Sequence, residues 1–345
     1  MGMILSLTLL LALAAGSPQG QQARIGEIDF FGTDGIDVQK VRSMLPVKKG
    51  EEIPEDKSPG VRERINRAVE RELGHPPTDV AFVCCDDQGS LMIYIGLGGR
   101  NTAFMTLLPA PNGTSCLAKN AVTLYNAAMD AVMPAIQKGN AVEDDSQGYA
   151  LSNDPALRAR QLAMRDYARA HGPSLERALQ ACAMPEHRRA AAEILGYGRK
   201  SATQIGALFR ASHDSDEEVR NNAVRALWVL AMASPENASE IPAGSFIAML
   251  NSGLWTDRNK AGQLLMALTR SRNPQLLDRL RRQALPSLVE MARWQDSSHA
   301  QAYRELLGRI AGFDEARIQQ LISNGRVDEI LAAVEHESPA RKPTR

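Results

Sequence analysis

Hydrophobic and polar residues alternate before about Gly98 of this 345-residue chain, whereas from about Ser152 onward the hydrophobic residues recur with a helical period. Alternation is typical of strands, because successive side chains point to opposite faces of a sheet. Hydrophobic residues three and four positions apart instead mark one face of a helix. The change of period predicts a multidomain chain in which a small α+β part precedes an all-α part.

The amino-terminal pattern predicts five elements in the order β-α-α-β-β. Strands are predicted at residues 25–32, 78–85 and 91–97, and helices at residues 36–45 and 58–73. Pro46 ends the first helix because a proline cannot continue the backbone hydrogen bonds. Ser58 caps the second helix and Gly74 ends it. Residues 102–108 are a candidate for one further strand of the same sheet.

The segment at residues 117–148 is interpreted as a connection between the two parts. Residues 117–137 carry hydrophobic side chains at helical spacing, which predicts one long amphipathic helix. Residues 143–148 are acidic and polar and contain a glycine, which predicts a linker. Asp144 and Asp145 lie in this linker and are predicted to be solvated, since no hydrophobic surroundings raise their pKa values.

The carboxyl-terminal part repeats one pattern. Each copy starts at an anchor residue, which is followed at +3 by alanine in three copies and by tyrosine in the fourth, and by hydrophobic residues at +6 and +7. The anchors are Arg188, Arg220, Arg258 and Ala300. Their spacing of 32, 38 and 42 residues is within the range of helical repeats, and a partner helix is predicted between successive anchors. One partner helix is predicted to break at Pro286.

These repeats resemble HEAT repeats, a class of armadillo-like arrays. The clearest copy is residues 214–227, with the sequence Asp-Ser-Asp-Glu-Glu-Val-Arg-Asn-Asn-Ala-Val-Arg-Ala-Leu. The resemblance implies a right-handed solenoid of antiparallel helix pairs over residues 149–336, which offers a curved surface to a partner. It also implies that Arg188, Arg220 and Arg258 are structural anchors that bond acidic or amide groups of a neighbouring repeat. Ala300 departs from this pattern.

The amino-terminal part resembles a POTRA domain. The resemblance is carried by Ile-Gly-Glu-Ile-Asp-Phe-Phe-Gly at residues 25–32, by Val-Lys-Lys-Gly at residues 47–50 and by the closing hairpin. It implies a domain over residues 24–116 that lies outside the cytoplasm and grips a client chain by adding a strand to an exposed sheet edge. The alternative is an unrelated small α+β fold with the same strand order.

The first residues are interpreted as a targeting segment. A hydrophobic run that ends in small residues predicts a signal peptide at residues 1–16, and hence a periplasmic or secreted protein. The alternative is a membrane-anchored protein that keeps an uncleaved amino-terminal segment. At the other end of the chain, residues 337–345 are predicted to be a disordered tail.

An exported chain can form disulfides, and this chain has four cysteines: Cys84, Cys85, Cys116 and Cys182. Adjacent strand residues point to opposite faces, so only one of Cys84 and Cys85 is expected to pair with Cys116. A bridge between Cys85 and Cys116 is predicted, with Cys84 as the alternative partner. Cys182 is predicted to be a small buried hydrophobic residue.

The charge balance and the spacing of reactive residues argue against several classes of function. Lys plus Arg and Asp plus Glu each number 40, and this balance argues against a nucleic-acid binder. The six histidines are scattered singly and no nucleophile elbow is found, so no catalytic, cofactor or metal site is predicted. We therefore expect an exported scaffold for protein–protein interaction, not an enzyme, which binds through its sheet edge and its repeat surface.

Two alternatives to this function remain open. The first is an accessory component of an outer-membrane or secretion assembly, associated with the cell envelope. The second is an enzyme that is similar to the lyase-like subgroup of HEAT proteins. The sequence does not identify the protein partner.

Overall fold

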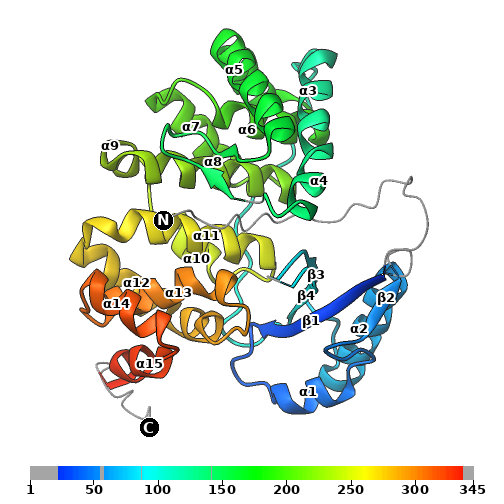
Figure 1. Cartoon of the computed structure of the whole chain (residues 1–345), viewed down its shortest axis with the longest axis vertical. Coiled ribbons are helices and arrows are strands. Elements are labelled where there is room, and N and C mark those ends of the chain that lie inside the picture. The colour runs from blue at the N-terminus through cyan, green and yellow to red at the C-terminus, as the bar shows by residue number, and fades with distance from the viewer. Residues whose placement is uncertain (1–21, 55–57, 87, 141, 337–345) are drawn as a thin grey trace. The chain divides into compact units, whose positions relative to one another are not determined.

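The structure is a computed structural model that describes residues 22–54, 58–86, 88–140 and 142–336. The predicted signal peptide (1–16) and tail (337–345) lie outside these residues. About 61% of the described residues are helical, and the remainder include a small mixed sheet. An α+β part and a helical part, as predicted, are therefore both present (Figure 1).

The described residues form two compact units, and neither unit is continuous in sequence. The first unit consists of Met105–Phe246 and Asn259–Leu268. The second unit consists of the described residues up to Phe104, of Ile247–Arg258 and of the chain from Thr269 onward. This differs from the linear division at 24–116, 117–148 and 149–336, because the last helices of the chain join the same unit as the amino-terminal sheet.

The sheet of the second unit has four strands in the order β2-β1-β4-β3. Its elements are β1 (Gln22–Phe31), α1 (Val38–Met44), β2 (Glu52–Pro54), α2 (Ser58–Leu73), β3 (Asp79–Val83) and β4 (Leu91–Gly96). β1 is parallel to β4, and the other pairs are antiparallel. The predicted helices and three predicted strands are confirmed within a few residues, whereas the short strand β2 and the absence of a strand at 102–108 were not foreseen.

One face of this sheet packs against α1 and α2. Ile28 and Phe30 of β1 point to this face and meet Ile65 and Val69 of α2, all of which are at most 5% exposed. The stripe of hydrophobic residues that predicts α2 is therefore the stripe that covers the sheet.

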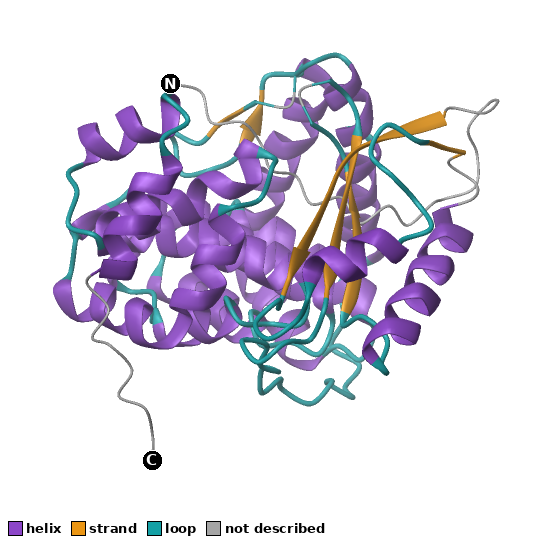
Figure 2. Cartoon of the chain, turned by 90° about the horizontal axis from the view of Figure 1, so that it is seen from below, coloured by secondary structure: helices purple, strands orange, loops and turns teal. Residues whose placement is uncertain are grey.

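The opposite face of the sheet is covered by helices from the end of the chain. Tyr94 of β4 stacks on Trp255, with ring centroids 4.9 Å apart, and lies 4.8 Å from Trp294. The indole Nε1 of Trp294 donates to the backbone oxygen of Phe30 at 2.9 Å, and the backbone NH of Gln295 donates to Asp29 at 2.8 Å. The strands of this sheet therefore lie between two groups of helices (Figure 2).

The helices of the second unit that follow the sheet lie in the last third of the chain. They are the end of α10 (Gly244–Met249), the start of α11 (Trp255–Leu268), η2 (Thr269–Ser271), α12 (Pro274–Ala292), α13 (Ser297–Ile310), α14 (Glu315–Ser323) and α15 (Val327–His336). The predicted break at Pro286 was wrong, because α12 continues through it. Leu280, Ala284 and Leu288 on the same helix are all fully buried, and their packing outweighs the local cost of the proline.

The first unit is built mainly from helices. Its elements are α3 (Lys119–Asp130), α4 (Val132–Gln137), β5 (Glu143–Asp144), β6 (Leu151–Ser152), α5 (Pro155–Ala181), α6 (Pro185–Gly196), α7 (Ala202–Ala211), α8 (Glu217–Ala233), α9 (Pro235–Ser239), the start of α10 and the end of α11. The predicted single helix at 117–137 is divided at Ala131, three residues before Pro134, which cannot donate the helical hydrogen bond.

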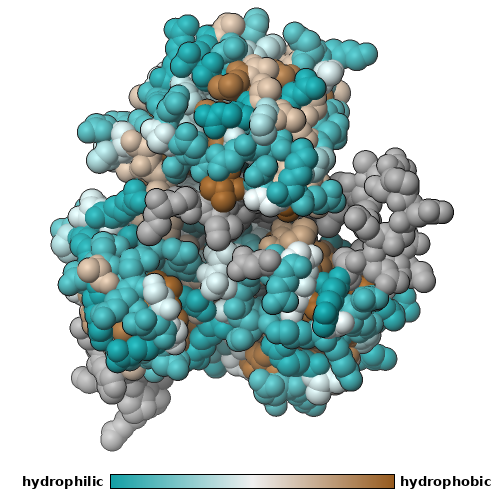
Figure 3. All heavy atoms as spheres, viewed as in Figure 1, coloured by the Kyte–Doolittle hydropathy of each residue, from teal (hydrophilic) through white to brown (hydrophobic). Residues whose placement is uncertain are grey.

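On the face shown in Figure 3, hydrophilic side chains dominate over both units, and hydrophobic ones are interspersed among them. None of the described helices combines the length and the hydrophobic character that are needed to cross a membrane.

Candidate functional site

The three predicted arginine anchors are buried, with exposed fractions of 2% for Arg188, 2% for Arg220 and 0% for Arg258. Each guanidinium donates to the backbone oxygen of the residue six positions earlier: Arg188 to Cys182 at 3.0 Å, Arg220 to Asp214 at 2.9 Å and Arg258 to Ser252 at 2.6 Å. The shared contact fastens each anchor helix to the loop that precedes it. It also gives buried carbonyl groups of that loop a donor.

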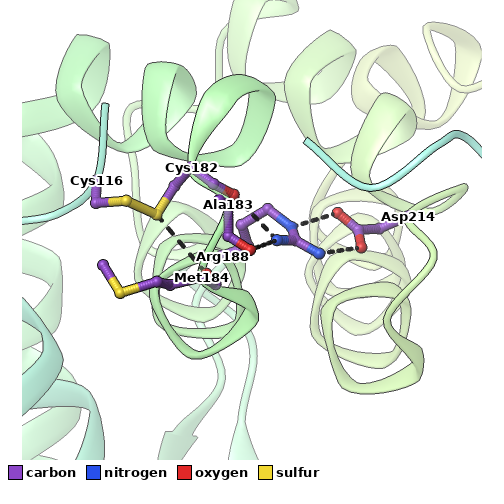
Figure 4. The surroundings of a disulfide bond; sticks show 6 residues. All are labelled: Cys116, Cys182, Ala183, Met184, Arg188 and Asp214. Carbon is purple, nitrogen blue, oxygen red and sulfur yellow. Dashed lines mark hydrogen bonds and ion pairs between the residues drawn. A yellow bond between two sulfur atoms is a disulfide. The ribbon is translucent and has the colours of Figure 1, made fainter. Parts of the chain in front are cut away.

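Arg188 also forms a bidentate ion pair with Asp214 (Figure 4). Its Nε and Nη2 atoms lie 2.8 and 2.9 Å from the two carboxylate oxygens. The backbone oxygen of Asp214 is the acceptor for Arg220, so this one residue contacts two successive anchors. We predict that these contacts stabilise the fold.

Arg258 pairs with a glutamate that the sequence did not single out, Glu290 of α12. The carboxylate of Glu290 also accepts the backbone NH of Gly32 at 2.8 Å and the backbone NH of Thr33 at 2.9 Å. Further donors are the Thr33 hydroxyl at 2.8 Å and the side-chain amide of Asn101 at 3.1 Å. Glu290 therefore ties an anchor helix to the turn that follows β1.

Gly32 is suited to this turn for a steric reason. Its φ of +65° lies in the left-handed region, and a Cβ at this position would come within 2.3 Å of the Thr102 hydroxyl. A larger residue would therefore displace the backbone NH that donates a hydrogen bond to Glu290.

A second group of charges is buried in the first unit. Arg225 of α8 lies 2.6 Å from Glu143 and 3.4 Å from Glu193, and all three side chains are at most 10% exposed. Burial raises the pKa of Glu143, although Arg225 acts in the opposite direction. Lys260 is 2% exposed, and burial, together with the charge of Arg225, lowers its pKa to about 7.

Glu143 is the first residue of the linker predicted at residues 143–148, and it is buried in the structure, whereas Asp144, which was predicted to be solvated, is 40% exposed. Glu143 belongs to β5, which pairs with β6, and its side chain is 7% exposed. Two partners farther along the chain, the guanidinium of Arg225 and the amide of Gln161, make its burial tolerable, because an unpaired buried carboxylate would be costly.

Residues 105–116, which we call the strap, run in an extended conformation past the loops of the first unit. The backbone NH of Leu108 donates to His213 at 2.7 Å, and the backbone oxygen of Gly113 accepts from Ala183 at 2.9 Å. Cys116 at the end of the strap is bonded to Cys182. The strap is thus attached at three places, and Gly113 forms an isolated parallel β-bridge with Cys182.

A shallow cleft of about 210 Å³ lies beside the strap. Leu108 and Pro109 of the strap line one side, and Leu179, Ala207 and Arg210 of the helices line the other. Leu107 and Leu108 are 39% and 44% exposed, so hydrophobic side chains stand open next to the exposed cation Arg210. This arrangement suits an extended chain that carries hydrophobic and acidic side chains.

The predicted bridge between Cys85 and Cys116 was wrong. Cys116 is bonded to Cys182, with a Cα–Cα distance of 4.7 Å, and Cys84 is bonded to its neighbour Cys85. β3 ends at Val83, so the alternation argument does not reach the two adjacent cysteines. The strap, which the sequence did not foresee, brings Cys116 to the end of α5.

His213 and Asp214 are adjacent in sequence, but their side chains do not pair with each other. The Nδ1 atom of His213 lies 3.1 Å from the backbone oxygen of Phe209 and 3.2 Å from the Ser212 hydroxyl. The Asp214 carboxylate is engaged by Arg188 instead.

No known protein family and no curated protein matches this chain. Among solved structures, it is similar to two engineered proteins of the Northeast Structural Genomics Consortium. One is 15% identical, covers 65% of this chain and 92% of its own length, and has a TM-score of 0.36. The other is 18% identical, covers 64% of this chain and 96% of its own length, and has a TM-score of 0.35. TM-scores this low carry no argument about fold or function.

Proposed function

We propose that this chain is an exported scaffold that binds an extended segment of a partner protein in the cleft beside the strap. The observation that carries the proposal is the combination of the exposed Leu107 and Leu108 with the neighbouring cleft. Hydrophobic side chains that stay exposed on an anchored backbone mark interaction surfaces more often than scattered single ones do.

The proposed architecture is a HEAT-like array preceded by a POTRA-like domain. The arginine contacts support it, because the same bond to the residue six positions earlier recurs at each of the three anchors. In this proposal the helices carry the strap, and the strap with the loops beneath it forms the binding surface. The right-handed solenoid and the periplasmic location are parts of the same proposal.

The helical surface is better supported than the sheet edge as the binding site. On the outer side of β1, Arg42 donates to the backbone oxygen of Ile28 at 2.9 Å, and Trp294 donates to that of Phe30 at 2.9 Å. β2 covers this side of β1 only at residues 22–24, and β2 and β3 are the edge strands of the sheet. A strand added beside the rest of β1 would therefore have to displace the contacts made by Arg42 and Trp294.

The partner chemistry follows from the lining of the cleft. Leu108 and Pro109 favour a hydrophobic side chain, and Arg210 favours a carboxylate. We therefore expect an extended segment that carries a hydrophobic and an acidic side chain.

The test compares two charge-introducing variants. Leu107→Asp/Leu108→Asp places charges on the proposed surface, and Met44→Asp places one on α1, where Met44 is 37% exposed. The partner is captured from cell envelopes with the natural chain, identified, and its affinity for each purified variant is measured. We expect a loss of at least about tenfold for the strap variant and none for Met44→Asp. If both folded variants bind the partner with equal affinity, the strap is not part of the binding surface.

A further inference from the structure

The disulfide between Cys116 and Cys182 has a histidine beside it. The two Sγ atoms and a ring nitrogen of His187 all lie within 4.8 Å of one another. Cys182 is fully buried, whereas Cys116 and His187 are partly exposed. The Nδ1 atom of His187 is buried and has no hydrogen-bond partner among the described residues. A buried ring nitrogen without a partner needs an explanation.

These three side chains come from well-anchored backbone positions. Cys182 follows the last residue of α5, and its backbone NH donates to Ala178 at 3.0 Å. His187 lies in the first turn of α6, and its backbone NH donates to Met184 at 3.2 Å. Cys116 ends the strap (Figure 4). The three groups would therefore stay close together even if the bond between the sulfur atoms were opened.

We propose that the reduced form of this cysteine pair binds a zinc ion together with His187. Two thiolates and one imidazole form a ligand set that zinc accepts, with one position left for water or another donor. Zinc–sulfur and zinc–nitrogen bonds of about 2.3 and 2.0 Å require only small movements of atoms that already lie this close.

The charge balance of the site also suits a divalent ion. Two thiolates neutralise Zn²⁺, so that little net charge is placed in a partly buried site. The nearby Arg188 donates to the backbone oxygen of Cys182 at 3.0 Å and is itself balanced by Asp214. The charges already present therefore do not oppose the ion.

Metal binding is coupled to a redox step. A dithiol reductant transfers two electrons and two protons to the disulfide, which yields two cysteine thiols and the oxidised, cyclic disulfide of the reductant. Zinc then replaces the two thiol protons, which are released to solvent. The bound ion reconnects the strap to the end of α5, so the attachment of the strap persists in a reducing environment.

The test uses the full chain with Cys84→Ser/Cys85→Ser, which removes the other disulfide. Zn²⁺ binding is measured by competition with a chromophoric chelator, after reduction with a phosphine and again after reoxidation. His187→Gln removes the proposed nitrogen ligand. His171→Gln, which alters an exposed histidine in the same unit, is the matched control.

We expect one Zn²⁺ per reduced chain, no binding by the oxidised chain, and an affinity lowered at least about tenfold by His187→Gln but not by His171→Gln. With Co²⁺, the reduced chain should show thiolate-to-metal charge-transfer absorption. The proposal fails if the reduced chain binds no zinc, if the oxidised chain binds it equally well, or if His187→Gln leaves the affinity unchanged. Circular dichroism of each variant establishes that it is folded, and the Co²⁺ spectrum tests thiolate ligation without any change at His187.

Discussion

Arg188 in the first unit and Arg258 in the second make the same contact with the loop before their helices, but they differ in their acidic partners. Arg188 binds Asp214, whose backbone in turn accepts from the next anchor, Arg220. Arg258 binds Glu290, whose carboxylate also accepts both backbone NH groups of the turn after β1. One motif thus connects successive helices in the first unit and connects helices to a sheet in the second.

The difference shows that the same arginine anchor can connect different elements, depending on its acidic partner. The carboxylate of Asp214 accepts from the guanidinium of Arg188 and from the backbone NH of Asp216 at 2.8 Å, and its backbone oxygen accepts from the next anchor. Glu290 gathers its donors from α11, from the turn after β1 and from Asn101. Removing the two acidic groups should therefore have unequal consequences.

The largest effect is expected for Glu290→Ala. It leaves the fully buried Arg258 without its counter-ion and leaves the NH groups of Gly32 and Thr33 without this acceptor, which should lower the free energy of unfolding by about 5 kcal/mol. Equilibrium urea unfolding measures the loss. Asp278→Ala on the same helix removes an exposed ion pair with Arg282 and should cost less than about 1 kcal/mol. Similar losses for both variants would contradict the central role of Glu290.

The second largest effect is expected for Arg188→Met. It should lower the free energy of unfolding by about 3 to 4 kcal/mol, because Asp214 remains buried without its ion-pair partner. The neighbouring Arg189 pairs with Asp216 and Glu218 while 32% exposed, so Arg189→Met should cost less than about 1 kcal/mol. A double-mutant cycle with Asp214→Asn isolates the coupling between Arg188 and Asp214. A coupling near zero would make the pair irrelevant to stability.

The stability of the second unit should depend on pH because of Asp29. Burial raises its pKa to about 6 from 3.8, so the folded chain holds a proton that the unfolded chain releases between these values. The contribution of this proton to stability is complete below pH 3.8 and is lost as the pH rises through about 6, by at most about 3 kcal/mol. Asp29→Asn should flatten this part of the profile of unfolding free energy against pH, and Asp166→Asn, at an exposed site, should not. An unchanged profile in Asp29→Asn would exclude Asp29 as the source.

The smallest effect concerns one hydrogen bond. Trp294→Phe loses the bond from the indole to the backbone of Phe30, whereas the Nε1 atom of Trp255 in the same aromatic cluster has no partner among the described residues. Trp294→Phe should therefore be less stable than Trp255→Phe by about 1 kcal/mol, as measured by thermal unfolding. The reverse order would mean that packing, not the hydrogen bond, dominates at this position.

Local pattern predicted the elements of the amino-terminal part well. The stripe that includes Val61, Ile65 and Val69 predicts α2, and the same residues are buried in the structure. The burial of β4 on both faces was not foreseen. Its run Leu-Met-Ile-Tyr-Ile is hydrophobic at consecutive positions, which is the signal of a strand covered on both sides.

The candidate site was less predictable. Arg188, Arg220 and Arg258 were found because their offsets to hydrophobic residues repeat along the chain. Glu290 and Glu143 had no such signal, because a single glutamate in a helix or a polar segment is normally solvated. Their partners Gly32 and Arg225 lie 258 and 82 residues away.

The sequence alone therefore determined most of the helices, three of the six described strands and the positions of the arginine anchors, because these depend on interactions between residues a few positions apart. Only the tertiary structure decided which face the last helices cover, where the strap runs, which cysteines are bonded and which acidic residues are buried. Those outcomes depend on contacts between distant segments, where the cost of burying a charge is offset by a partner that local sequence cannot reveal.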